Sequence, residues 1–502
     1  MNLINSLYNA FVQNKEKHVF CINDVFYTYE NLLACIIKTR KIIADHIADN
    51  ESFIGLVTNN DLETYATIFS IWMEGKAYIP VNPTAPISRN EAIFKAIDVH
   101  YVFDSSQKTD FTSFKVLNIN HFENTTQSLS LFEPVKFDDK SIAYVLFTSG
   151  STGNPKGVPI SFKNLNALFN ELDIDDEYKL KSSDRCLQMY DLTFDASLTA
   201  LLPTLLVGAC AYTVPSNVIK YLYVFKLLVK HKLTVLKMVP SIIYYLRPYF
   251  PEINATSVRY CVFGGEKLYK DIVDEWVKCI PNSKVLNHYG PTEFTVCSGY
   301  YNYKIADSNK SHNGVLSIGK PFKNVDYLIL DGNNNVLPDD NVEGELCLAG
   351  NQLTQGYWKN DKLNASSFFI NKTDLDVAKR FYKTGDLCYR DEDGFYMYVG
   401  RKDFQVKIGG YRVELGEIEY HARNHASTNA LNLVVIDVKN SSNNDELVLV
   451  IESSKFDTTD LLVYMNEKLA EYMVPNKVFF LDKFPYNSNG KLDRKKLKEL
   501  IG

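Results

Sequence analysis

The sequence Thr148-Ser149-Gly150-Ser151-Thr152-Gly153-Asn154-Pro155-Lys156-Gly157 follows directly on a short apolar run, residues 144–147. Its hydroxyl side chains, glycines and single lysine supply flexible backbone, hydrogen-bond donors and one cation, which is what a loop needs to wrap a polyphosphate. It is not a Walker A loop, because Lys156 is followed by glycine where that pattern needs Ser or Thr. The stretch therefore predicts a nucleotide loop on a different fold, with an ordinary solvated turn as the alternative.

Composition narrows the class of protein. A chain of 502 residues has room for roughly three domain-sized units. The net charge of -6 leaves no basic footprint for nucleic acid or an anionic membrane. The nine cysteines form no Cys-x-x-Cys pair, and several lie in apolar runs, as Cys35, Cys261 and Cys347 do, which predicts reduced, buried thiols rather than zinc or disulfides. Without a secretory signal or an apolar run of about 18 residues, we expect a cytoplasmic protein.

Strand and helix patterns alternate along the first part of the chain. Thr28 is a candidate cap for a helix whose apolar residues fall on one face. Further on we expect helices at 65–72 and 93–97, and strands at 53–57, 77–81 and 99–103. Such alternation predicts an α/β architecture in which helices cover largely parallel sheets.

The pattern changes near residue 400. A glycine-broken, β-rich stretch follows Asp403, then a helix beginning near Glu414, and then two strands, 431–438 and 447–452, joined by a polar turn. We therefore divide the chain into a core, residues 1–400, and a small α+β C-terminal domain, residues 401–502.

Several further motifs, taken with the loop at 148–157, resemble those of the adenylate-forming superfamily, which includes acyl-CoA ligases, luciferases and peptide-synthetase adenylation domains. They are Ala77-Tyr78-Ile79-Pro80-Val81, Asn287-His288-Tyr289-Gly290-Pro291-Thr292-Glu293, Tyr382-Lys383-Thr384-Gly385-Asp386, Gly400-Arg401 and Asn487-Ser488-Asn489-Gly490-Lys491. The resemblance covers nearly the whole chain and is nearest to a stand-alone amino-acid adenylation domain of nonribosomal peptide synthesis. Asn82 stands where many members have aspartate, at a position without a catalytic role.

The resemblance implies ATP and Mg²⁺ as cofactors. Tyr289 would offer a flat face to the adenine, Asn287 would hydrogen-bond the base, Thr292 would donate to the α-phosphate, and Glu293 would supply a hard oxygen ligand for Mg²⁺. The glycines of Gly264-Gly265-Glu266 would let the backbone pass beside the adenine.

The remaining nucleotide contacts follow from the same resemblance. Asp386 would accept from the ribose hydroxyls, with Arg401 adding a further contact. The loop would hold the leaving pyrophosphate through Ser149, Gly150, Ser151, Thr152, Gly153 and Lys156. The residues assigned as catalytic are Thr148, Thr292, Glu293 and the family's catalytic lysine, Lys491.

The implied reaction is attack of a carboxylate on the α-phosphorus of ATP, which gives an acyl adenylate and pyrophosphate. Its barrier lies in bringing two anions together, which is work for positioned cations and donors. A mobile C-terminal domain would then rotate about a hinge at Asp403 and bring residues 407–412 in place of the Lys491 loop. The expected acceptor is the phosphopantetheine thiol of a carrier protein acting in trans, because the sequence ends at Gly502 without a carrier domain.

Phe194-Asp195-Ala196-Ser197 resembles the motif that sets an aspartate against the α-ammonium of an amino-acid substrate. The alternative is that Asp195 merely caps a helix. The resemblance implies a side-chain pocket lined by Ala196, Thr199, Lys237, Val262, Gly264, His288, Val296 and Cys297.

Two lining residues, Lys237 and His288, are basic and predict an acidic substrate side chain, since a buried cation without a partner is costly. The pocket resembles those that activate aspartate. Asparagine and a β-substituted aspartate compete closely. If Lys237 pointed to solvent, a small neutral amino acid such as D-alanine would fit instead.

Three rival functions remain. An acyl-CoA ligase for an ordinary organic acid has no use for Asp195, and a luciferase-like oxygenase would need an apolar aromatic pocket. A degenerate nucleotide-binding module is expected to have lost Glu293, Asp386 or Lys491, and the sequence keeps all three.

Overall fold

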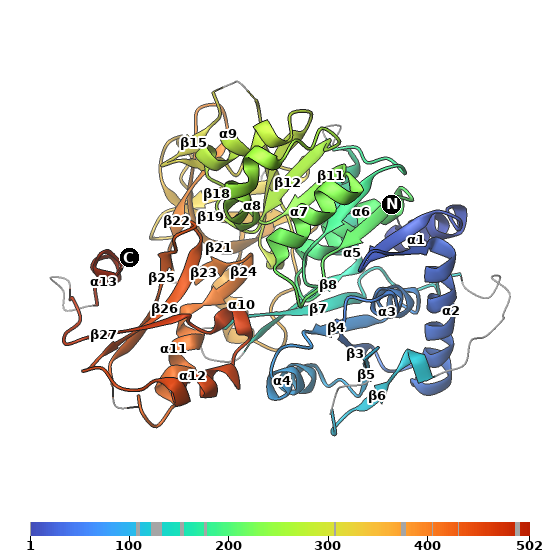
Figure 1. The fold of residues 1–502 in the computed structure, drawn as a ribbon, viewed down its shortest axis with the longest axis horizontal. Coiled ribbons are helices and arrows are strands. Elements are labelled where there is room, and N and C mark those ends of the chain that lie inside the picture. The colour runs from blue at the N-terminus through green and yellow to red at the C-terminus, as the bar shows by residue number, and fades with distance from the viewer. Residues whose placement is uncertain are drawn as a thin grey trace. The chain divides into compact units, whose positions relative to one another are not determined.

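The computed structural model describes residues 2–106, 111–121, 133–150, 155–174, 178–305, 308–372, 378–403, 405–429, 431–486 and 492–501 (Figure 1). The chain forms two compact units. The first comprises Met1–Asn82, Phe94–Leu146 and Gly157–Lys402, and the second comprises Pro83–Ile93, Phe147–Lys156 and Asp403–Gly502. The division into domains at 400–401 stays a prediction.

A six-stranded sheet has the order β6-β5-β3-β4-β7-β8. Its pairs from β6 through to β7 are parallel. The strands are β3 (Phe53–Val57), β4 (Ala77–Val81), β5 (Tyr101–Phe103), β6 (Lys115–Leu117), β7 (Ile142–Thr148) and β8 (Lys156–Ser161), and the helices along this part of the chain are α2 (Tyr29–His46), α3 (Leu62–Met73) and α4 (Ile87–Ile97). The first two of these strands match the sequence prediction in full, and the third is shorter.

A nine-stranded sheet follows, in the order β17-β14-β13-β12-β11-β9-β10-β1-β2. It is parallel at its centre and antiparallel at both edges. Its strands are β1 (His18–Ile22), β2 (Val25–Thr28), β9 (Arg185–Gln188), β10 (Cys210–Thr213), β11 (Val235–Met238), β12 (Tyr260–Gly264), β13 (Lys284–Tyr289), β14 (Gly299–Tyr303) and β17 (Lys320–Pro321). Parallel strands linked by helices confirm the predicted α/β class.

The helices of this part of the chain are α1 (Leu3–Gln13), α5 (Phe162–Ile174), α6 (Ala196–Leu206), α7 (Lys220–His231), α8 (Ser241–Leu246) and α9 (Lys270–Cys279). A third, five-stranded antiparallel sheet contains β18 (Val325–Leu330), β19 (Gly344–Gly350), β20 (Phe368–Lys372), β21 (Ala378–Arg390) and β22 (Tyr396–Arg401), with α10 (Asp361–Ser367) beside it. Short pieces complete the unit: β15 (Ser311–His312), β16 (Val315–Leu316), and the 3₁₀ turns η1 (Ile119–His121), η3 (Arg247–Glu252) and η4 (Thr292–Phe294).

The second unit contains a hairpin of β23 (Gln405–Ile408) and β24 (Tyr411–Glu414), followed by α11 (Leu415–Arg423). A three-stranded sheet of β25 (Leu433–Lys439), β26 (Asp445–Glu452) and β27 (Lys477–Leu481) follows, with α12 (Thr459–Asn466), η5 (Glu471–Met473) and α13 (Arg494–Ile501). The helix near Glu414, the two strands and the turn between them agree with the sequence prediction.

Local signals explain several boundaries. Thr28 and Asn31 form a reciprocal capping box at the start of α2, which satisfies two backbone donors that the helix leaves unpaired. Gly75 lies just past α3 with a φ of 67°, a conformation that costs a residue with a Cβ more than glycine.

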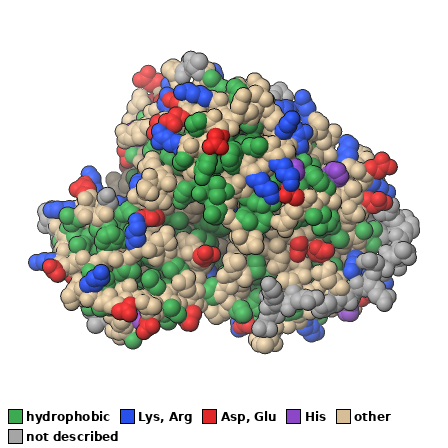
Figure 2. Space-filling view, in the orientation of Figure 1, with side chains coloured by type: hydrophobic (Ala, Val, Ile, Leu, Met, Phe, Trp, Pro, Cys, Tyr) green, Lys and Arg blue, Asp and Glu red, His purple; other side chains and the backbone are tan. Residues whose placement is uncertain are grey.

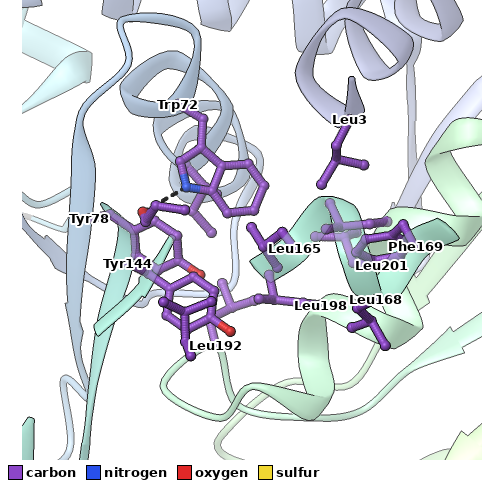
Figure 3. Packing of buried hydrophobic residues seen from close by; sticks show 14 of the residues in the cluster. Leu3, Trp72, Tyr78, Tyr144, Leu165, Leu168, Phe169, Leu192, Leu198 and Leu201 are labelled. Atoms are coloured by element: carbon purple, nitrogen blue, oxygen red, sulfur yellow. Dashed lines mark hydrogen bonds between the residues drawn. The ribbon is translucent and has the colours of Figure 1, made fainter. Parts of the chain in front are cut away.

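The main core of the first unit is a large cluster of buried apolar side chains, part of which is shown in Figure 3. Trp72, Tyr78 and Tyr144 are buried together, and the Trp72 indole donates to the Ala143 carbonyl oxygen at 2.8 Å. Apolar residues of α5 and α6 pack into the same cluster, among them Leu165, Leu168, Leu198 and Leu201. This packing fixes β7, which leads into the loop at 148, and α6, which begins after Asp195.

Acidic and basic side chains are interspersed over the face shown in Figure 2. All nine cysteines are free thiols. Among the described residues, none of the helices combines the length and the apolar character that a membrane span requires.

Candidate active site

Tyr289, Asp386 and Arg401 meet in the first unit. Asp386 on β21 lies opposite Arg401 on β22, and the Arg401 Nη1 lies 2.7 Å from the Asp386 Oδ1. The Tyr289 hydroxyl donates to the Asp386 Oδ2 at 2.5 Å. Burial, reinforced by Asp386, raises the pKa of Tyr289 well above its usual value, so its hydroxyl stays a neutral donor. The predicted adenine and ribose residues are thus brought together as one hydrogen-bonded group.

The other predicted adenine residues hold structural contacts. The Asn287 Nδ2 donates to the Ser317 carbonyl oxygen at 3.0 Å, and the Glu266 Oε2 accepts from the Ser241 amide at 2.8 Å, where α8 begins. A Cβ added at Gly264 would lie 3.3 Å from the His288 carbonyl oxygen. Gly265 has a φ of 87°. Their roles toward adenine stay predictions.

Glu293 lies in η4 and is fully buried, with 0% exposure. Its Oε1 accepts a hydrogen bond from the Tyr357 hydroxyl at 2.6 Å, and its carbonyl oxygen accepts from the Thr354 amide at 3.0 Å. A hard carboxylate oxygen is the type of ligand with which proteins hold Mg²⁺ alongside nucleotide phosphates. The residues present therefore fit the implied cation.

The turn after Glu293 is strained and tightly held. Thr295 and Val296 are β-branched, yet their φ values are 52° and 71°, and each such residue costs of the order of 1–3 kcal/mol. The Thr295 Oγ1 donates to the Gln352 carbonyl oxygen, and the Gln352 Nε2 donates to the Cys297 carbonyl oxygen, both at 2.6 Å. Gln352 therefore fixes the backbone that carries Val296 and Cys297, two predicted pocket residues.

Asp195 occupies the N-cap position of α6 but makes no capping hydrogen bond through its side chain. It is 6% exposed. The interpretation of Asp195 as a simple helix cap is therefore wrong. The two further pocket residues on α6 are Ala196 and Thr199, and the Thr199 hydroxyl donates to the Ala196 carbonyl oxygen at 3.0 Å.

Lys237 and His288 lie on one face of the nine-stranded sheet. Lys237 pairs with Val262, and Gly264 pairs with His288, so strand alternation directs all four to the same side. Lys237 is 6% exposed, which rules out the alternative that it points to solvent. No carboxylate lies within ion-pair distance of Lys237 in the part of the chain that the structure describes.

Burial and neighbouring charged groups shift the pKa values of three of the predicted pocket residues. Burial lowers the pKa of Lys237 to about 8, and Cys297 opposes that effect. Burial and then Lys237 lower the pKa of His288 well below its usual value, and the buried His288 Nδ1 has no hydrogen-bond partner among the described residues. The pKa of the Cys297 thiol is raised to about 12, chiefly by burial. Asp195 adds to this rise, and Lys237 opposes it. Lys237 therefore interacts electrostatically with both His288 and Cys297, and Cys297 interacts with Asp195.

The described part of the phosphate loop belongs to the second unit. There the Ser149 Oγ donates to the Arg412 carbonyl oxygen at 2.9 Å, and the Gly150 amide donates to the Glu417 Oε2 at 3.0 Å. The Lys156 Nζ lies 2.9 Å from the Glu414 Oε1. These donors already bind oxygen atoms, two of them on carboxylates, which is the behaviour expected of an anion-binding loop.

Two further predicted residues, Thr148 and Asp403, also belong to the second unit. The Thr148 Oγ1 is buried without a hydrogen-bond partner among the described residues. Asp403, the predicted hinge, accepts from the Gln405 amide at 3.2 Å. Ser151, Thr152, Gly153 and Lys491 lie outside the described residues.

Sequence reasoning missed two residues, Gln352 and Tyr357. Both lie on the stretch that follows β19, and both bind the turn that carries Glu293 and Cys297. A Gln and a Tyr in a polar loop carry no signal of such a role, because their partners lie more than fifty residues away in sequence.

Comparison with known proteins agrees with this geometry. The family model described as AMP-binding enzyme matches residues 8–358. The chain is 30% identical over 480 residues to gramicidin S synthase 2 of Aneurinibacillus migulanus, covering 93% of this chain and 10% of that protein. The chain thus spans about a tenth of that much longer relative.

Two solved structures share the fold. One is the adenylation domain AlmE of Vibrio cholerae in complex with glycyl-adenosine-5'-phosphate, with a TM-score of 0.86 and 24% identity, covering 99% of this chain and 97% of that one. The other is holo-PA1221, an NRPS protein containing adenylation and PCP domains, with a TM-score of 0.86 and 20% identity, covering 99% of this chain and 84% of that one.

The chain is an enzyme of the adenylate-forming class. More particularly, it belongs to the AMP-binding enzyme family, whose model covers more than half of its length.

Proposed function

We propose that this chain activates aspartate as aspartyl-AMP at the expense of ATP, and then passes the aspartyl group to the phosphopantetheine thiol of a separate carrier protein. The observation that carries the proposal is the pair of buried basic side chains, Lys237 and His288, on one face of the nine-stranded sheet. A substrate β-carboxylate would supply the partner that a buried cation needs.

The amino acid would be held at two ends. Asp195, which does not use its side chain to cap α6, would accept from the α-ammonium group. Lys237 would donate to the β-carboxylate, and His288 would add a hydrogen bond through its ring. The strained turn at Thr295–Val296 would close the pocket with Val296 and Cys297.

The nucleotide would be held by the residues that the sequence motifs predict. Tyr289, Asp386 and Arg401 would bind the adenosine, and the loop at 148–156 would bind the leaving pyrophosphate. Glu293 would hold Mg²⁺, which when bound neutralises charge on the phosphate oxygens. Lys491 would bridge the substrate carboxylate and the α-phosphate, so that one anion can approach another.

Transfer to a carrier would require the second unit to move about Asp403. The name of a relative, gramicidin S synthase 2, and the adenylation and PCP domains of holo-PA1221 support a carrier protein as acceptor. Nine free thiols suit a reducing compartment, which favours the cytoplasm.

Exchange of labelled pyrophosphate into ATP, run with each proteinogenic amino acid and with D-aspartate, D-alanine and succinate, tests the substrate. We expect aspartate to give the fastest exchange. Succinate, which lacks the ammonium group, is expected to fail, and its success would favour an acyl-CoA ligase. Nucleotide binding without exchange on any acid would favour a degenerate binding module.

Transfer of the aspartyl group to the thiol acceptor needs a separate assay. Aspartyl transfer is expected to a phosphopantetheinylated carrier protein supplied as a separate chain. Efficient formation of aspartyl-coenzyme A, with no transfer to any carrier encoded beside the enzyme, would overturn the carrier part of the proposal and leave the adenylation part standing.

A further inference from the structure

The carboxylate of Glu293 is oriented by a residue from a different part of the chain. The Tyr357 hydroxyl donates to the Glu293 Oε1 at 2.6 Å. Three residues earlier, the Thr354 amide donates to the Glu293 carbonyl oxygen at 3.0 Å. Glu293 is therefore held through its side chain and its backbone by one short segment, residues 354–357.

Tyr357 is itself tightly fixed. Its amide donates to the Asn364 Oδ1 at 2.7 Å, and the Asn364 Nδ2 donates back to the Tyr357 carbonyl oxygen at 3.0 Å. Its hydroxyl lies 3.2 Å from that of Tyr382, and its ring packs against Phe368 at a centroid distance of 5.9 Å. Tyr357 is 4% exposed and Tyr382 is 2% exposed, so neither side chain has room for another position.

A buried carboxylate has two requirements if it is to bind a cation well. Its charge must be compensated by hydrogen bonds before the cation arrives, and its oxygens must already point in the binding direction. A short hydrogen bond from a fixed hydroxyl to Oε1 meets both requirements. It gives the buried carboxylate a hydrogen-bond donor, and it sets the plane of the carboxylate.

We propose that Tyr357 is a positioning residue for the nucleotide-bound magnesium ion, because its hydroxyl sets the orientation of the Glu293 carboxylate. The inference rests on the proposed role of Glu293 as the metal ligand and adds to it a residue that does not itself touch the metal. The Tyr382 hydroxyl, 3.2 Å from that of Tyr357, helps to hold the Tyr357 hydroxyl in place.

The Tyr357 hydroxyl donates to Glu293 and lies beside the Tyr382 hydroxyl, and neither partner is predicted to line the amino-acid pocket. Its removal is therefore expected to weaken metal binding and to leave amino-acid recognition unchanged. Loss of an outer hydrogen bond to a metal ligand weakens metal affinity by about 10–100-fold.

Binding of Mn²⁺ as a probe for Mg²⁺, followed by electron paramagnetic resonance in the presence of α,β-methylene-ATP, tests the proposal without turnover. Tyr357→Phe keeps the ring and removes only the hydroxyl, and we expect it to weaken Mn²⁺ binding by about 10–100-fold. The KM for the amino acid is expected to stay within about two-fold of wild type, and the lost activity is expected to return at high Mg²⁺.

Tyr29→Phe is the matched control. Tyr29 is fully buried, and its hydroxyl donates to the Ala209 carbonyl oxygen at 2.8 Å. We expect it to lose stability comparable to Tyr357→Phe and to bind Mn²⁺ as wild type does.

The outcomes separate the two levels of the proposal. Wild-type Mn²⁺ affinity in Tyr357→Phe, together with lost affinity in Glu293→Gln, would overturn the role of Tyr357 and leave Glu293 as the ligand. Wild-type affinity in Glu293→Gln would instead overturn the metal site itself. If Tyr357→Phe fails to fold, Tyr382→Phe is used, with a several-fold weakening expected and unchanged affinity counting against the proposal.

Discussion

Lys237 and His288 lie on the same face of the nine-stranded sheet, with β12 between their strands, and Lys237 lowers the pKa of His288. Burial disfavours the charge on Lys237, and burial together with Lys237 disfavours a charge on His288, so this is an unfavourable place for two basic groups. An anionic ligand between them would turn that cost into binding energy. We therefore expect the predicted pocket to be satisfied by an anionic substrate.

Replacing Lys237 by methionine tests this arrangement on two readouts. The change keeps most of the volume and removes the buried charge, so we expect the folded protein to become more stable and thermal unfolding to occur at a higher temperature. In the same variant, kcat/KM for aspartate is expected to fall by at least ~100-fold, because the substrate carboxylate loses its buried charge partner. Lys226→Met, on the exposed part of α7, is the control and is expected to change neither. Lower stability with unchanged kcat/KM would contradict the pocket assignment.

The pH dependence of stability follows from the same lysine. Its pKa in the folded protein is about 8 against an ordinary 10.5, so between these values the unfolded chain binds more protons than the folded one. The free energy of unfolding therefore rises as pH increases from about 8 to 10.5. Below pH 8 the buried, protonated lysine lowers the free energy of unfolding by its full amount, about 3 kcal/mol. Chemical unfolding of wild type and Lys237→Met across this range measures it. We expect the advantage of the variant to shrink as pH rises; an advantage independent of pH would count against a buried ammonium.

Asp195→Ala separates substrate binding from helix capping, because alanine, unlike asparagine, cannot cap a helix. Because the Asp195 side chain makes no capping hydrogen bond, the variant is expected to unfold at the same denaturant concentration as wild type. A capping aspartate would lose about 1 kcal/mol on truncation. Pyrophosphate exchange is expected to fall by at least ~100-fold, because the α-ammonium loses its ion partner. Marked destabilisation with normal exchange would restore the capping interpretation.

Gln352→Met removes the donor that holds the Cys297 carbonyl oxygen. The left-handed turn at Thr295–Val296 is then expected to relax, which lowers the free energy of unfolding by about 1–3 kcal/mol and raises the KM for the amino acid several-fold. Thr67→Val, which removes a buried hydroxyl that donates to the Glu63 carbonyl oxygen at 2.7 Å, is the control for stability alone. If both variants lose stability and neither changes the KM, Gln352 is structural only.

Much of the fold could be predicted from the sequence, because the signals were local. Phe53–Val57 and Ala77–Val81 are largely buried apolar runs, and Thr28 caps α2 as its residue type predicts, although the reciprocal bond from Asn31 was not foreseen. The predicted strand at 99–103 begins two residues later than expected, at Tyr101, after Asp98 with a φ of 64°. Such a turn conformation is hard to foresee at a residue other than glycine.

The site was predictable where motifs are contiguous and unpredictable where contacts are distant. Tyr289 and Asp386 could each be assigned to the nucleotide, but their direct hydrogen bond depends on how β13 lies against β21. Tyr357 and Gln352 act on residues some 55 to 64 positions away. Only the packing of the chain brings them there.

The most direct test of the central claim is pyrophosphate exchange by the wild-type enzyme with aspartate, asparagine and alanine at equal concentration and neutral pH, where Lys237 is protonated. Asparagine matches aspartate in shape and lacks only the charge. We predict that aspartate exchanges at least about 10-fold faster than either, as a buried charge pair requires. Exchange with asparagine or alanine at the aspartate rate or above would contradict an acidic substrate.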